Sequence, residues 1–110
     1  MTADDVRRLA LAFPGAVEAF HLHQPNYRLE GRIFASVGSP DFDSGIVKLT
    51  LEQQRGFVDR NDGVFRPASG TLGRSGYTIV RLSSLTEDEL RDILEKSVHN
   101  VLDRSPVAST

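Results

Sequence analysis

The spacing of apolar residues predicts three helices, each beginning at a threonine. In every case an Asp, Gln or Glu stands three residues after the threonine, a pairing that caps the free N–H groups of a first helical turn. Apolar side chains then recur at helical spacing. They follow Thr2 (Val6, Leu9, Ala10, Phe13), Thr50 (Leu51, Phe57, Val58) and Thr86 (Leu90, Ile93, Leu94, Val98, Val101, Leu102). We therefore predict an N-terminal, a middle and a C-terminal helix.

Between these helices the apolar period changes to two, which is typical of strands with one buried face. The alternation runs on both sides of Glu30-Gly31, a dipeptide suited to a two-residue hairpin turn because glycine accepts a positive φ. Strands are predicted at 27–29, 33–37, 46–49 and 77–82, with a short extended piece at 17–21 and a brief strand at 64–66. The pattern predicts an α+β fold, a two-layer sandwich whose antiparallel sheet of about five strands carries three helices mainly on one face.

Composition fits one folded domain spanning residues 1–110. Hydrophobic residues make up 39% and charged residues 25% of the chain, an ordinary balance for a globular protein. The absence of cysteine excludes disulfides, thiol chemistry and cysteine-ligated zinc. The start of the chain is acidic, and no stretch approaches the eighteen apolar residues of a membrane span, so we expect a cytoplasmic protein with no membrane partner.

The histidines do not suggest a metal site. His21 and His23 stand two residues apart, and on a strand both imidazoles would point to one face, as some metal sites require. A third ligand is missing, because His99 lies on the distant C-terminal helix. We predict no metal at these residues.

Two other segments resemble known ligand-binding loops but lack a residue that each loop requires. The run Asp41-Phe42-Asp43-Ser44-Gly45 resembles part of a calcium loop, but its sixth position is Ile46 where a sharply turning glycine is needed. The glycine-rich stretch 70–76 lacks the lysine of a phosphate-binding P-loop and precedes a strand instead of a helix. No nucleophile elbow or Ser-His-Asp spacing stands out either. We therefore predict no cofactor and no enzymatic activity.

Basic residues form the candidate site. The formal net charge is −2, which gives no long-range attraction to nucleic acid, but residues 63–85 contain three arginines and no acidic residue. Two more arginines flank the Glu30-Gly31 turn and a lysine lies on the next predicted strand, 46–49. The candidate nucleic-acid-binding residues are Arg28, Arg32, Lys48, Arg66, Arg74 and Arg81. Charge alone leaves two interpretations open: a basic surface at one end of the sheet, or solvated charges spread over both faces.

The ordered motifs of the chain resemble the MmcQ/YjbR family over nearly its whole length. They are His21-x-His23-x-Pro25-x-Tyr27-Arg28, Glu30-Gly31-Arg32-Ile33-Phe34-Ala35, Val47-Lys48-Leu49, Gly63-Val64-Phe65-Arg66-Pro67-Ala68 and Leu72-Gly73-Arg74-x-Gly76-Tyr77. The resemblance implies a two-layer domain like those of frataxin and secretion chaperones. It also implies DNA binding, since members are described as meeting the duplex with two hairpin-like wings.

Carried onto this sequence, one wing is the hairpin around Gly31, with Arg28 and Arg32, and the other is the loop 66–76, with Arg74. The leading hypothesis is therefore DNA binding through phosphate contacts that do not read the base sequence. The alternative is a protein-interaction or small-ligand-binding module that uses the exposed sheet face or a pocket under the glycine loop.

Overall fold

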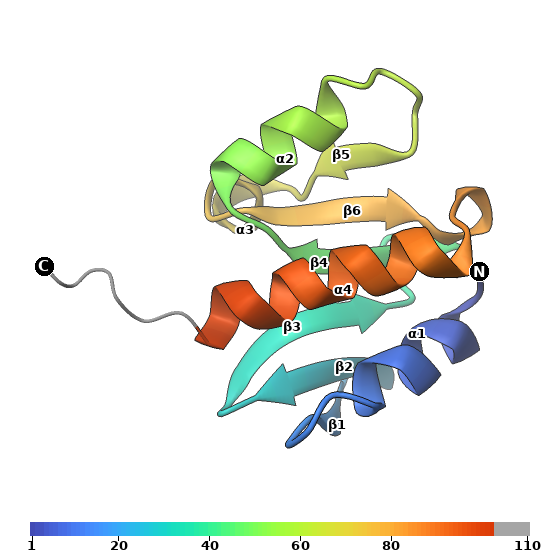
Figure 1. The fold of residues 1–110 in the computed structure, drawn as a ribbon, viewed down its shortest axis with the longest axis vertical. Helices are drawn as coiled ribbons and strands as arrows, with labels where there is room; N and C mark the ends of the chain where they lie inside the picture. Colours follow the sequence, from blue (N-terminus) through green and yellow to red (C-terminus); the bar gives the residue numbers. More distant parts are fainter. Residues whose placement is uncertain (103–110) are drawn as a thin grey trace, which may run out of the picture.

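The computed structural model describes residues 1–102, which fold into a six-stranded antiparallel sheet of order β1-β2-β3-β4-β6-β5. The strands are β1 (Val17–His21), β2 (Gln24–Leu29), β3 (Arg32–Val37), β4 (Ser44–Lys48), β5 (Phe65–Pro67) and β6 (Tyr77–Arg81). The helices are α1 (Ala3–Leu11), α2 (Leu51–Val58), α3 (Gly70–Arg74) and α4 (Glu87–Leu102), with a 3-10 turn at Leu82–Ser84. Helices α1, α2 and α4 lie on one face of the sheet (Figure 1). The predicted α+β sandwich is confirmed, with six strands instead of about five and a fourth, short helix.

All three predicted threonine caps are present. The Thr50 hydroxyl accepts a hydrogen bond from the Gln53 backbone N–H at 3.0 Å, and the Gln53 amide oxygen accepts one from the Thr50 N–H at 3.0 Å. Thr86 with Glu89 and Thr2 with Asp5 form the same reciprocal pairs at the starts of α4 and α1.

None of the helices within residues 1–102 combines the length and apolar character that a membrane crossing requires.

Two tight hairpins join the first three strands. The turn between β2 and β3 is Glu30-Gly31, as predicted, with φ of 52° and 80°. The turn between β1 and β2 is Leu22-His23, whose φ values of 51° and 68° are uncommon for such residues. The sequence gives no signal for this second turn because neither residue is Gly, Asn or Asp. The predicted strand at 27–29 therefore begins earlier, at Gln24.

The core lies between the sheet and the helices. Tyr27, Ala35, Val47 and Thr78 form one buried row across β2, β3, β4 and β6. Above this row, α4 contributes its buried apolar residues Leu90, Ile93, Leu94 and Val101. The register shift opposite Tyr27 lets Phe34 reach the helix side, where its ring packs edge-on against Phe13 at 6.1 Å.

Replacing Gly56 by alanine is expected to stabilise the protein by about 0.5–1 kcal/mol. Gly56 lies inside α2, is exposed, and has no atom of another element within 4 Å of the position that a Cβ would take. Urea unfolding of Gly56→Ala should show a higher midpoint at unchanged slope. A lower midpoint would contradict the open surroundings of this residue.

Candidate functional site

The sheet has a second face, which the helices do not cover. Residues paired across an antiparallel ladder share a face, and neighbours along a strand alternate. One continuous row of cross-strand partners lies opposite the buried row: Asn26, Ser36, Ile46, Ile79 and Arg66. We call the strand positions on this side the open face.

Four of the six candidate basic residues lie on the open face. Arg66 belongs to the row itself, and Arg28, Lys48 and Arg81 follow from the alternation along β2, β4 and β6. Arg28 also donates from Nε to the Asn26 side-chain oxygen at 2.8 Å, which places it beside that residue. The structure therefore gathers cations from four strands that are far apart in the sequence.

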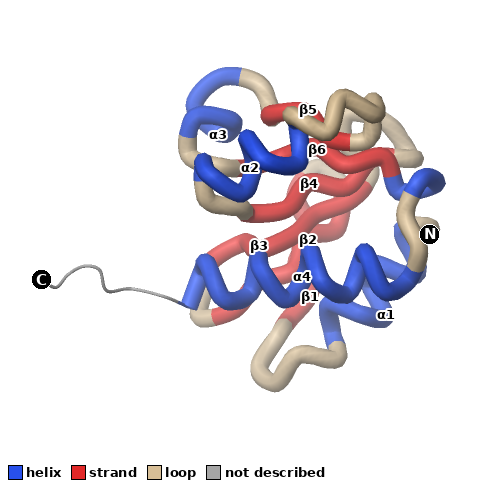
Figure 2. Tube along the Cα trace, turned by 45° about the horizontal axis from the view of Figure 1, so that its top comes forward, coloured by secondary structure: helices blue, strands red, loops and turns tan. Residues whose placement is uncertain are grey.

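The other two candidates lie elsewhere. Arg32 is paired with the buried Leu29, and its Nη1 donates to the Val101 carbonyl in the last turn of α4 at 3.2 Å, so it lies on the helix side. Arg74 ends α3 and borders a shallow depression together with Leu51 and Gln54 of α2. Figure 2 shows α3 beside α2, beyond β6. The turn between β2 and β3 and helix α3 do share one end of the sheet (Figure 1).

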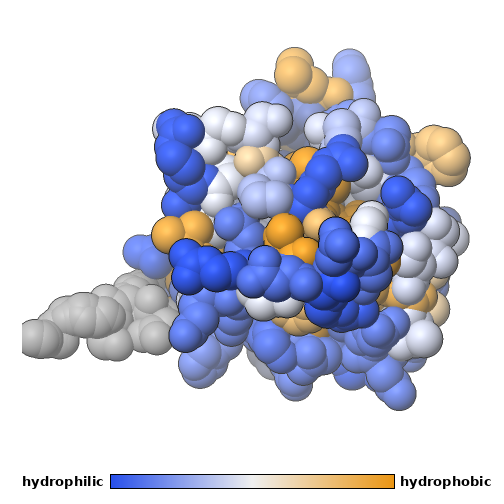
Figure 3. All heavy atoms as spheres, turned by 90° about the horizontal axis from the view of Figure 1, so that it is seen from above, coloured by the Kyte–Doolittle hydropathy of each residue, from blue (hydrophilic) through white to orange (hydrophobic). Residues whose placement is uncertain are grey.

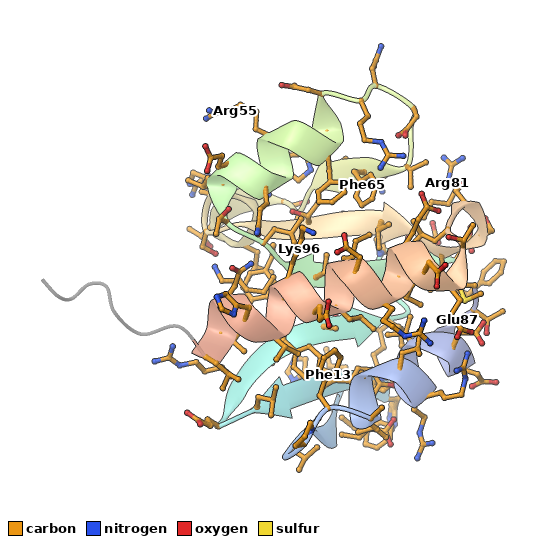
Figure 4. All side chains as sticks on the ribbon, in the orientation of Figure 1. Phe13, Arg55, Phe65, Arg81, Glu87 and Lys96 are labelled. Atoms are coloured by element: carbon orange, nitrogen blue, oxygen red, sulfur yellow. The ribbon has the colours of Figure 1, made fainter. Side chains whose placement is uncertain are left out.

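Ion pairing separates the helix side from the open face. Five basic side chains form ion pairs within residues 1–102: Arg7, Arg8, Arg60, Arg91 and Lys96. All but Arg60, which follows α2, belong to α1 or α4. Glu87, between α1 and α4 in Figure 4, accepts from Arg8 at 2.9 Å and Arg91 at 2.6 Å, and these bonds lower its pKa. In the described part of the chain, none of the six candidate residues has a carboxylate within 4.0 Å of its cationic nitrogens.

Lys48 is a half-buried cation of the open face. Its Nζ lies 5.1 Å from the centre of the Tyr77 ring and donates to the Ser75 carbonyl oxygen. Burial lowers the pKa of this lysine. The Tyr77 hydroxyl in turn donates to the Ile33 carbonyl of β3 at 2.9 Å, so the ring lies across β4 and packs against the Lys48 ammonium group. Lys48 can therefore offer only part of its donor capacity to a ligand.

Arg66 and Arg81 are exposed and border a concavity of about 200 Å³ at the other end of the open face. Figure 4 shows Arg81 at the end of β6. Ile79, the cross-strand partner of Arg66, also lines the concavity, and the β3–β4 loop supplies Phe42 and Asp41. Two exposed arginines and an exposed phenylalanine thus line one hollow, together with the acidic residues Asp41 and Asp43.

In the loop 41–45, which resembles part of a calcium loop, both carboxylates accept hydrogen bonds from other groups of the protein. The Asp41 Oδ1 accepts from the Asp43 N–H and from the Ser44 hydroxyl, each at 3.0 Å. The Asp43 carboxylate accepts from the Ser83 N–H at 3.0 Å and from its hydroxyl at 2.6 Å. These contacts tie the loop to the turn that follows β6.

The two neighbouring histidines do not share a strand face. His21 ends β1, whereas His23 lies in the positive-φ turn that follows. Within residues 1–102, no three His, Cys, Asp or Glu side chains converge in a way that would hold a metal ion.

The glycine motif at 72–77 has a structural use. The buried Gln54 donates from Nε2 to the Gly73 carbonyl, the Tyr77 carbonyl and the Thr78 hydroxyl, each at 3.1 Å. Sequence reasoning missed Gln54, because nothing distinguishes this amide from the polar residues around it in α2. The motif thus packs α3 and the start of β6 against α2 and positions Tyr77 on the open face.

Comparison with known proteins identifies the family and supports the fold. The sequence model of the YjbR family matches residues 11–98, which include the open-face residues and the glycine motif. The fold is similar to that of Deinococcus radiodurans protein DR2400, described as a DUF419 domain, with a TM-score of 0.78 at 17% identity, covering 98% of this chain and 83% of that one. Among curated proteins, none matches the sequence. The family match over most of the chain shows that this protein belongs to the YjbR family.

Proposed function

We propose that this protein binds nucleic acid on the open face of its sheet, through phosphate contacts that do not read base sequence. One observation carries the proposal: four cations without ion pairs share a face on which no strand position within residues 1–102 is acidic. Phosphates are the ligands that such unpaired guanidinium and ammonium groups favour.

The negative net charge does not oppose this proposal, because the acidic residues lie mainly on the helices. Helices α1, α2 and α4 carry Asp4, Asp5, Glu52, Glu87, Asp88, Glu89, Asp92 and Glu95. Salt screens exposed charges beyond about 10 Å at 0.1 M. A phosphate on the open face therefore interacts only weakly with the acidic helices, and mainly with the cations next to it and, at the concavity, with Asp41 and Asp43.

The spacing of the cations suits a phosphate chain. Lys48 is paired with Tyr77, and Arg81 stands four residues further along β6. At about 3.3 Å per residue these positions lie roughly 13 Å apart along the sheet. One strand of B-DNA places about four phosphates in that length, at about 3.4 Å of helix axis each. Lys48 and Arg81 can thus contact phosphates about four steps apart on one strand, while Arg66 and Arg28 lie to either side of this line across the sheet.

Salt dependence tests the proposal. A labelled duplex titrated between about 50 mM and 200 mM salt should show log K falling against log salt with a slope of about −3.6, or about −0.9 for each of four contacts. Arg81→Gln should reduce the steepness by about one unit. As a matched control, Arg91→Gln removes an ion-paired arginine of α4 and should leave the slope unchanged. Folded protein that fails to bind at the lowest salt, or equal effects of the two variants, would refute the proposal.

Protein interaction is the second candidate, and strand β1 supports it. This edge strand and its turn expose Val17 (55%), Phe20 (66%) and Leu22 (80%), without the proline that marks the other edge strand, β5. On the opposite edge of the sheet, at α2 and β5, hydrophobic residues are only scattered over a largely hydrophilic surface (Figure 3). If a partner strand pairs with β1, Phe20→Lys should abolish that complex without changing duplex binding.

A further inference from the structure

Phe42 is the most exposed of the large hydrophobic residues among the described part of the chain, at 88%. A single exposed hydrophobic residue is ordinary on a protein surface. Here, however, Phe42 lines the same concavity as Arg66 and Arg81. An accessible aromatic ring beside unpaired guanidinium groups is the combination that binds the bases and phosphates of single-stranded nucleic acid.

The backbone around Phe42 is anchored on both sides. Asp41 accepts hydrogen bonds from within the loop, and Asp43 accepts two from Ser83. The ring is therefore presented from a loop that is tied to the end of β6, next to Arg81. A ligand that stacks on it need not pay for ordering the loop first.

We propose that this concavity binds one unstacked nucleotide of a single strand, with the base on Phe42 and the phosphates on Arg66 and Arg81. This inference rests on the proposed function and specifies the form of nucleic acid. The volume of about 200 Å³ lies below the roughly 300–1,000 Å³ of pockets for drug-sized ligands, so it suits part of a nucleotide and not a whole dinucleotide cofactor.

The carboxylates of the concavity set the orientation of the nucleotide. Asp41 and Asp43 repel phosphate, which therefore lies on the arginine side. Asp43 is occupied by Ser83, whereas Asp41 uses one oxygen within the loop, so its Oδ2 can accept an N–H of the base edge. Carboxylates accept from cytosine N4 in this way. An intact duplex hides that edge and the base faces, so the site selects a single strand.

The chain contains no tryptophan, which makes Phe42→Trp a selective reporter. We expect short oligo-deoxycytidine to quench the fluorescence of the introduced tryptophan by stacking, while the same length of duplex binds with little quenching. Phe20→Trp, which places the reporter on another exposed phenylalanine outside the open face, should remain unquenched. Phe42→Ala should weaken single-strand binding about fivefold to 100-fold, and Phe20→Ala should not.

Anisotropy of the labelled oligonucleotides separates the possible failures. If both nucleic acids bind but the tryptophan of Phe42→Trp is not quenched, this inference is overturned. It is also overturned if Phe42→Ala binds the single strand as tightly as the unchanged protein. Either result would leave the proposed function standing. No binding of either nucleic acid would overturn both. Equal quenching by deoxycytidine monophosphate and by the oligomer at the same nucleotide concentration would assign the site to a free nucleotide and overturn the assignment to a strand.

Discussion

Gly76→Ala is expected to destabilise the protein by about 3 kcal/mol or more. Gly76 has φ of +106°, and a Cβ there would lie 1.8 Å from the Leu49 carbonyl oxygen and 3.0 Å from its carbon. Both atoms are backbone, so no side-chain rotation relieves the overlap. The same contact includes the hydrogen bond from the Leu49 N–H to the Gly76 carbonyl at 3.1 Å, which any backbone shift would strain.

Urea unfolding measures this effect, with Gly31→Ala as the control. Gly31 also has a positive φ, of +80°, but nothing lies within 4 Å of its would-be Cβ. The control carries only the conformational penalty, about 1 kcal/mol. Similar losses in the two variants would contradict the close packing of the glycine motif against the end of β4.

The second large effect is the loss of nucleic-acid binding when all four open-face cations are removed together. We expect the combination of Arg28→Gln, Lys48→Gln, Arg66→Gln and Arg81→Gln to weaken duplex binding about 1,000-fold or more at roughly 0.1 M salt. Each phosphate contact contributes about 0.9 to the slope of log K against log salt. One contact therefore raises the affinity about eightfold between 1 M and 0.1 M salt, and the factors of the four contacts multiply.

A variant of equal charge provides the control. Arg7→Gln, Arg8→Gln, Arg91→Gln and Lys96→Gln remove the same number of cations from the helix side, where each forms an ion pair. Exposed ion pairs contribute little to stability, so this variant should remain folded. Binding should fall far less than in the open-face variant. Equal losses would mean that net charge, and not the open face, governs binding.

Local chemistry made much of the fold predictable. The three helices begin at Thr2, Thr50 and Thr86 because each cap is complete within four residues of sequence. The Glu30-Gly31 turn was predictable for the same reason. The Leu22-His23 turn and α3 were not predictable. The pairing of His21 with Gln24 leaves only Leu22 and His23 for the connection, which imposes positive φ on these two exposed residues, and α3 is a short helix that contains two glycines.

The candidate site was predictable in composition but not in arrangement. Arg28 and Arg32 stand four residues apart around one hairpin, yet they lie on opposite faces of the sheet. The two-residue Glu30-Gly31 turn decides this, because it pairs Arg32 with Leu29, whose side chain lies on the face opposite Arg28. The contact of Arg32 with the end of α4 leaves no sequence signal. Phe42 acquires its significance only through the arginines that the fold brings next to it.

The most direct test of the open face as the binding surface is an NMR titration of the isotope-labelled protein with a short oligonucleotide. Binding should shift the backbone amides of β4, β5 and β6 around Ile46, Arg66 and Ile79 and leave those on the outer surfaces of α1 and α4 unchanged. Shifts concentrated on α1 and α4, or on β1 alone, would contradict binding at the open face.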